Sequence, residues 1–178
     1  HPNNLRNEEE LKYIKKLAPN VIVVAAYGQI IPDEILDISN INFINVHASL
    51  LPKWRGAAPI QRAIMEMDRE TGVTIMKIIS KLDSGPYMLQ KKIKIKNNEN
   101  NATISKKLSE LGAELIIKSL DLIETKKAEY ISQKESEATY AKKIKKVECQ
   151  IKWDIPAKKL VAKINGLSPF PGAWFNHN

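Results

Sequence analysis

The positions of apolar residues divide the chain into segments that alternate between the strand pattern and the helix pattern. Residues 21–26 form an unbroken apolar run, which predicts a strand that is buried on both faces. Apolar spacing and turn residues predict further strands at 41–46, 73–79 and 87–95, and helices at 8–18, 32–36, 59–67, 103–123 and 156–164. Strands that alternate with helices predict an α/β fold with a mostly parallel sheet and flanking helices.

Polar residues and prolines mark the ends of several predicted helices. Asn7 is a suitable N-cap for the first helix, and the glutamates that follow it lie at the positive end of the helix dipole. Thr103 is predicted to cap the long amphipathic helix. Pro59 and Pro156 suit the first turns of their helices, because a proline there loses no hydrogen bond.

The composition is that of an ordinary globular protein. Of the 178 residues, 43% are apolar and 27% are charged, which excludes a low-complexity fibre or a chain that is disordered throughout. No apolar run reaches the roughly 18 residues of a membrane span, so no membrane partner is expected. The single cysteine, Cys149, cannot form an internal disulfide, which favours a reducing compartment, and we expect a cytoplasmic protein.

The net charge of +8 is confined to the second half of the chain. Residues 1–90 carry 10 basic and 10 acidic side chains, whereas residues 91–178 carry 18 lysines and 10 acidic side chains. Such asymmetry is typical of proteins that meet a polyanion, and nucleic acid is the first candidate. A solvated lysine-rich surface without a nucleic-acid partner is the alternative.

Candidate catalytic residues lie where predicted strands end, because ligands of parallel α/β sheets bind beyond the carboxyl ends of the strands. Asn45 and His47 are two residues apart on one predicted strand, so both side chains point to the same face. Asp83 lies in a loop expected at the same edge of the sheet. An amide, an imidazole and a carboxylate together can polarise a carbonyl group and move a proton. Taken singly, the first two also fit a hydrogen-bonded core pair, and the aspartate fits a plain turn.

The loop after His47 is apolar where a surface loop is usually polar, through Ser49, Leu50, Leu51 and Pro52. A loop of this kind either packs back on its own domain or forms the wall of a pocket for a flat apolar ligand. The residue pattern alone leaves both interpretations open.

These motifs together resemble the folate-dependent formyltransferases. The resemblance rests on residues 45–52 (NVHASLLP) and 82–85 (LDSG), where Asp83 takes the place of the family's catalytic aspartate. The branch that formylates methionine on initiator tRNA is most similar at 24–30 (VAAYGQI), 54–64 (WRGAAPIQRAI), 70–74 (ETGVT), 138–141 (ATYA) and 171–174 (PGAW). So many motifs in one order make the resemblance specific. Lys81, Ser84 and Phe170 depart from the family's usual residues and are expected to adjust packing only.

The resemblance implies a Rossmann-like catalytic domain over residues 1–147, with a first β-α-β portion before His1. Residues 148–178 are then a linker and the start of an OB-like C-terminal β-barrel domain that binds tRNA. The implied reaction passes a formyl group from the co-substrate 10-formyltetrahydrofolate to the α-amino group of methionyl initiator tRNA. It needs direct attack by the amine and no metal. The enzyme is expected to be a monomer.

The resemblance also implies roles for individual residues. Asn45, His47 and Asp83 are expected to be catalytic, with Asn45 donating a hydrogen bond to the oxyanion and Asp83 orienting His47. Arg55 either approaches the acceptor or the tRNA, or forms a salt bridge within its own loop. Folate binding is expected from two loops, which comprise Ser49, Leu50, Leu51 and Pro52 and, after the first strand, Tyr27, Gly28 and Gln29.

Two other functions stay open on the residues alone. A sibling formyltransferase that acts on an amino sugar or a ribonucleotide amine would keep the same three catalytic residues and change the acceptor. A basic RNA-binding module would use them only for structure. A fragment that lacks the first part of the catalytic domain could also be inactive.

Overall fold

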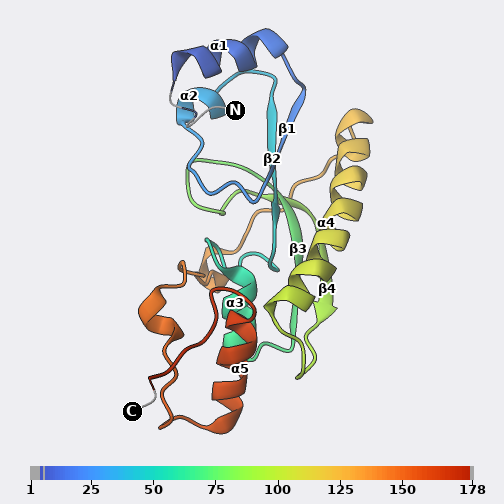
Figure 1. Cartoon of the computed structure of the whole chain (residues 1–178). Helices are drawn as coiled ribbons and strands as arrows, with labels where there is room; N and C mark the ends of the chain where they lie inside the picture. The colour runs from blue at the N-terminus through green and yellow to red at the C-terminus, as the bar shows by residue number, and fades with distance from the viewer. Residues whose placement is uncertain (1–4, 6, 177–178) are drawn as a thin grey trace.

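Four strands form one mixed sheet in the order β1-β2-β3-β4 (Figure 1). The computed structural model describes residue 5 and residues 7–176. β1 (Val21–Ala25) pairs in parallel with β2 (Asn42–His47), whereas β3 (Glu70–Lys77) is antiparallel to β2, and β4 (Tyr87–Lys94) is antiparallel to β3. The α/β class with flanking helices is confirmed, but the mostly parallel sheet is not. One cause is that residues 78–86 form a loop too short for the crossover that parallel strands require.

The apolar run of β1 is not buried on both faces as predicted. Val23 is 43% exposed, because β1 lies at the edge of the described sheet and is paired only with β2. An unbroken apolar run indicates a strand, but it does not say which neighbours cover that strand. The third strand also differs from its prediction, since it begins at Glu70 and ends at Lys77 and does not span residues 73–79.

Two apolar clusters cover the two faces of the sheet. The larger one packs α4 (Asn101–Glu124) and α3 (Pro59–Met65) against β2 and β3, and it comprises Ile44, Ile64, Val73, Ile75, Ile104, Leu108, Leu111 and Leu115. The smaller one joins α1 (Glu8–Leu17) and α2 (Asp33–Leu36) to β1 and β2 through Ile31, Ile35 and Phe43. The fold therefore fixes β2, which carries the candidate residues, from both faces.

Helix ends follow the predicted chemistry with one correction. Asn7 accepts a hydrogen bond from the backbone N–H of Glu9 and caps α1 as predicted. The cap of α4 is Asn100, whose Oδ1 accepts from the backbone N–H of Thr103, so the prediction that Thr103 is the cap was wrong. Asparagine and threonine both suit an N-cap, and the first of the two along the chain, Asn100, caps this helix.

The segment after α4 returns toward α3 and packs beside the loop that follows β2 (Figure 1). It contains two short 3-10 helices, η1 (Glu135–Glu137) and η2 (Lys146–Cys149), and it leads to α5 (Ala157–Leu167), which packs on α3. Within the described residues after 148, the strand-like structure is one isolated bridge between Gln150 and Trp174. The expected start of a β-barrel is therefore not visible as strands in this part of the chain.

Arg62 ties α3 to the returning segment. Its Nη1 lies 2.8 Å from Glu148 Oε2, and its Nη2 donates to Glu148 Oε1 and to the backbone carbonyl of Lys142. The paired geometry is the form of arginine–carboxylate contact that best fixes orientation.

Protonation of Glu148 is expected to weaken this contact at acid pH. Hydrogen bonds from the Arg62 side chain, and then from the Lys145 backbone, lower the pKa of Glu148 below its usual range. A carboxylate with a lowered folded-state pKa stabilises the fold above its unfolded pKa of about 4.3, and this contribution is lost as the pH falls through the folded-state value. The melting temperature should therefore fall less steeply with acidification in Glu148→Gln than in the original protein. An equal effect of Glu110→Gln, at an exposed helix position, would contradict this reason.

Candidate active site

The carboxyl end of β2 presents two polar side chains on one face. Asn45 lies opposite Met76 of β3 and His47 lies opposite Thr74. His47 is 6% exposed, whereas Asn45 is half-buried. Among the described residues, the Asn45 side chain makes no hydrogen bond, so its amide is available to a bound molecule.

Both ring nitrogens of His47 face oxygen atoms of the protein. Nε2 lies 2.9 Å from the backbone carbonyl of Trp54, and since a carbonyl only accepts, Nε2 carries the hydrogen of this bond. Nδ1 lies 3.7 Å from Asp83 Oδ2, a gap longer than a hydrogen bond. The contact with Trp54 therefore fixes the ring, and Nδ1 is the nitrogen that can exchange a proton.

Asp83 stands in the loop between β3 and β4 and is fixed there at both its side chain and its backbone. Its Oδ2 accepts a hydrogen bond of 2.8 Å from the backbone N–H of Gly56, and its backbone carbonyl accepts one from Gln133 Nε2 at 2.9 Å. Its φ of 44° lies in the left-handed region, which is uncommon for a residue with a Cβ. The carboxylate is thus aimed at His47 by a backbone conformation that neighbouring groups must stabilise.

The three predicted catalytic residues are therefore brought together. Asn45 and His47 come from β2, and Asp83 comes from the loop that follows β3. Because β3 is antiparallel to β2, this loop leaves the sheet toward the amino end of β2 and not at the carboxyl edge that was predicted. The arrangement supplies a free amide donor beside an imidazole and a carboxylate. Such a set can stabilise negative charge on a carbonyl oxygen and relay a proton.

Most groups of the loop of residues 49–52 are buried or hydrogen-bonded within the protein. Ser49 is fully buried, and its Oγ donates to the backbone carbonyl of Lys53 at 2.6 Å. Thr74 Oγ1 donates to the Ser49 carbonyl and accepts from the backbone N–H of Leu51, which is itself 3% exposed. Only Leu50 and Pro52 keep partly exposed side chains, so the predicted contact with folate rests on those two within this loop.

The other predicted folate loop, Tyr27 to Gln29, is exposed and follows the carboxyl end of β1. Since β1 and β2 are parallel, this loop lies at the same edge of the sheet as His47. Tyr27 Oη donates to Gln29 Oε1 at 3.5 Å, and an added Cβ at Gly28 would meet nothing within 4 Å. The loop is open to solvent in this structure, and its contact with folate stays a prediction.

Arg55 forms a salt bridge, but its partner is Glu135 on the returning segment and not a residue of its own loop, as one of the two predictions had it. Its side chain has no exposed surface in this structure, and contact with an acceptor or a tRNA stays a prediction. Nη1 lies 2.9 Å from Glu135 Oε2, and Nε donates to Gln133 Oε1 at 3.0 Å. Hydrogen bonds from Lys81, first, and from Arg55 lower the pKa of Glu135.

Sequence reasoning missed three residues that organise the site. The backbone carbonyl of Trp54 fixes His47, the backbone N–H of Gly56 binds Asp83, and the side chain of Gln133 binds the Asp83 loop. The first two act through backbone atoms, which any residue carries. The third lies fifty positions from Asp83 in a polar stretch without a local pattern.

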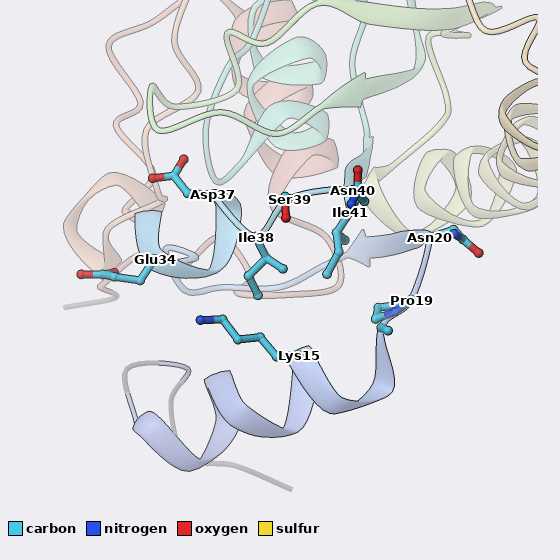
Figure 2. A pocket seen from close by; sticks show the side chains of 10 residues that line it. Lys15, Pro19, Asn20, Glu34, Asp37, Ile38, Ser39, Asn40 and Ile41 are labelled. Carbon is cyan, nitrogen blue, oxygen red and sulfur yellow. The ribbon is translucent and has the colours of Figure 1, made fainter.

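Two hollows of the surface lie away from this site. One pocket of about 460 Å³ is lined by residues of α1 and α2 and by the segments that lead from them into β1 and β2. Figure 2 shows Lys15 and Glu34 at this pocket on different helices. A second, of about 700 Å³, lies between α1 and the segment from Ile30 to Ile35. Neither is lined by Asn45, His47 or Asp83.

Two features of the described residues bear on metal binding and on membrane insertion. Within them, no group of three or more His, Cys, Asp or Glu side chains is arranged to hold a metal ion. Among the helices of the same residues, none is both long enough and apolar enough to span a membrane.

Comparison with known proteins identifies the family. Residues 1–120 match the family described as formyl transferase, and residues 143–178 match the formyl transferase C-terminal domain. The chain therefore belongs to the formyl transferase family. Methionyl-tRNA formyltransferase of Pelagibacter ubique is 52% identical over 98% of this chain, and that of Dictyoglomus turgidum is 49% identical over 97%. The matches cover 56% and 55% of those proteins, so the chain spans about half the length of the curated relatives it matches.

A solved structure supports the fold. HypX from Aquifex aeolicus, crystallised in complex with tetrahydrofolic acid, matches 93% of this chain and 28% of its own with a TM-score of 0.81 at 20% identity. The predicted family and the Rossmann-like class are thereby confirmed. The predicted domain boundary after residue 147 stays a prediction.

Proposed function

We propose that this protein transfers a formyl group from N10 of 10-formyltetrahydrofolate to the α-amino group of methionine esterified to initiator tRNA. The observation that carries the chemistry is the free amide of Asn45 beside the His47–Asp83 pair at the carboxyl end of β2. Relatives that are about half identical to the chain are named methionyl-tRNA formyltransferase, and these names support methionyl-tRNA as the acceptor.

In this reaction the amine nitrogen attacks the formyl carbon and creates a tetrahedral intermediate with negative charge on oxygen. The Asn45 amide donates a hydrogen bond to that oxygen, and the charge makes the bond stronger in the transition state than in the ground state. No group of the protein becomes covalently attached. The bond between the formyl carbon and N10 then breaks, and the formyl group stays on the amine.

The same steps move one proton from the attacking amine to the departing N10. His47 Nδ1 is suited to this transfer, because its other nitrogen is occupied by the Trp54 carbonyl. Asp83 Oδ2, at 3.7 Å from Nδ1, stabilises the positive imidazolium whenever the ring carries both protons. The proton is thus returned within one site, and no metal is required.

Folate binding is proposed at the loops that border this edge of the sheet. The side chains of Leu50 and Pro52 and the exposed loop from Tyr27 to Gln29 flank the carboxyl ends of β1 and β2. The tetrahydrofolate complex of HypX, which shares the fold, supports a folate co-substrate.

For the tRNA, the exposed lysines of the second half supply positive charge, and they include Lys142, Lys143, Lys145 and Lys146. Contacts of lysine with backbone phosphates supply affinity that falls with salt and carries little sequence information. We therefore expect the methionyl end to be recognised at the site and the tRNA body by charge.

The test is a comparison of acceptors with the purified protein and 10-formyltetrahydrofolate. Methionyl-tRNA, a nucleotide-linked amino sugar and a ribonucleotide amine are offered at equal concentration, and the formylated products are measured by mass spectrometry. We expect kcat/KM for methionyl-tRNA to exceed the other two by about a hundredfold or more. Faster formylation of a small amine, or RNA binding without turnover of any acceptor, would contradict the proposal.

A further inference from the structure

The loop that carries Asp83 is bound by a side chain from a distant part of the chain. Gln133 Nε2 donates one hydrogen bond to the backbone carbonyl of Asp83 at 2.9 Å and another to that of Gly85 at 2.7 Å. The two bonds span the residue between them, and they use both hydrogens of the amide. They fix the backbone directly after the bond at which Asp83 adopts its left-handed φ.

The orientation of this amide follows from its partners. Gln133 Oε1 accepts from Arg55 Nε at 3.0 Å, and a guanidinium has only donors, whereas both partners of Nε2 are carbonyls, which only accept. Arg55 is buried and is itself fixed by Glu135. The reversed amide would leave three polar contacts unmade, so Arg55 selects the orientation that binds the loop.

The backbone on both sides of Gln133 is anchored to the same region. Ile131 exchanges two backbone hydrogen bonds with Tyr87, the first residue of β4, at 3.0 and 2.8 Å. Further along, Thr139 and Ala141 form backbone hydrogen bonds with Arg55. The returning segment is therefore in register with the Asp83 loop on one side and with the loop after β2 on the other.

We propose that Gln133 is a positioning residue for the transfer reaction. It sets the backbone of the Asp83 loop, and Arg55 sets Gln133, so that the carboxylate is aimed at His47. Gln133 lies between the two segments that match the family, 1–120 and 143–178, in a stretch with no assigned role. The proposal rests on the function proposed above, since it concerns the same His47–Asp83 pair.

The test compares two substitutions with one matched control. Gln133→Leu removes all three hydrogen bonds, whereas Gln133→Glu keeps an oxygen for Arg55 and removes both donors to the loop. Gln150→Leu is the control, because Gln150 is also half-buried in the second half of the chain and its side chain makes no hydrogen bond to the described residues.

We expect both substitutions at Gln133 to lower kcat about tenfold or more, and KM for the formyl donor to change by less than about twofold. The melting temperature of Gln133→Glu should stay near that of the original protein, which separates positioning from loss of fold. The His47 imidazole signals in a ¹H–¹³C NMR spectrum should shift in both variants and stay unchanged in Gln150→Leu.

An unchanged kcat together with unchanged His47 signals in Gln133→Glu would overturn the proposal. An equal loss of kcat in Gln150→Leu would overturn it as well, because the effect would then not depend on the loop. If the original protein formylates no acceptor, the proposed function fails, while the His47 signals still decide whether Gln133 sets the geometry of the pair.

Discussion

Asn45→Ala is expected to lower kcat for formyl transfer by about a hundredfold or more and to leave the fold intact. The Asn45 amide is half-buried and makes no hydrogen bond to the described residues, so its removal strands no partner inside the protein. The loss falls on the transition state, where a single donor to an oxyanion is worth roughly a factor of 10² to 10³. Single-turnover rates of formyl transfer, measured at saturating 10-formyltetrahydrofolate, give the effect directly.

Asn42→Ala is the matched control for this substitution. Asn42 lies on the same strand and is also half-buried, but it stands at the opposite end, where β2 begins. Its loss should leave the rate within about twofold of the original protein. If Asn45→Ala retained the original rate, or if both substitutions lowered it equally, Asn45 would not be the oxyanion donor.

The second large effect is expected from Gly85→Ala, in the loop that carries Asp83. A Cβ at this position would lie 1.9 Å from the backbone carbonyl oxygen of Lys77, which belongs to β3 and cannot swing aside. The loop must therefore move away from the strand, and its contact with Gln133 through the Gly85 carbonyl is disturbed at the same time. We expect a loss of about 3 kcal/mol in the free energy of unfolding, or roughly 6–12 °C in melting temperature.

Gly28→Ala provides the comparison for stability. The same added methyl group at Gly28 meets nothing within 4 Å, so the melting temperature should stay within about 2 °C of the original. Formyl transfer by Gly85→Ala should also fall, because the displaced loop carries Asp83. A melting temperature equal to that of Gly28→Ala would show that the loop accommodates the methyl group without moving.

The sequence was most informative about the candidate catalytic residues, because they lie in short motifs. Asn45 and His47 share a face because strands alternate, so their placement could be predicted from a local rule. Asp83 does approach His47, but the edge predicted for its loop was wrong, because β3 is antiparallel to β2 and the loop leaves β3 toward the amino end of β2. The order and direction of the strands were harder to predict from the sequence. An apolar run such as that of β1 does not reveal its neighbours, and the direction of β3 depends on packing over the whole sheet.

The role of Arg55 shows why charge alone misleads. An arginine in a loop beside a predicted site suits an anionic ligand, but Nε and Nη1 of this one are bound by Gln133 and Glu135, about eighty residues further along the chain. No local pattern links these positions. The partners of a buried charge are fixed by tertiary structure, and only coordinates reveal them.

One consequence follows from the way the returning segment is hydrogen-bonded to the loop after β2. A boundary drawn where the first family match ends, at residue 120, separates Arg55 from Gln133, Thr139 and Ala141. The segment matched by the family model therefore lacks residues that are hydrogen-bonded to the candidate site. A protein truncated at that boundary would retain every proposed catalytic side chain and the contact of Gly56 with Asp83, but it would lose both hydrogen bonds from Gln133 to the Asp83 loop. Shuffling of C-terminal domains among members of this family should join the pieces beyond Ala141, where the segment has made its last contact with this loop.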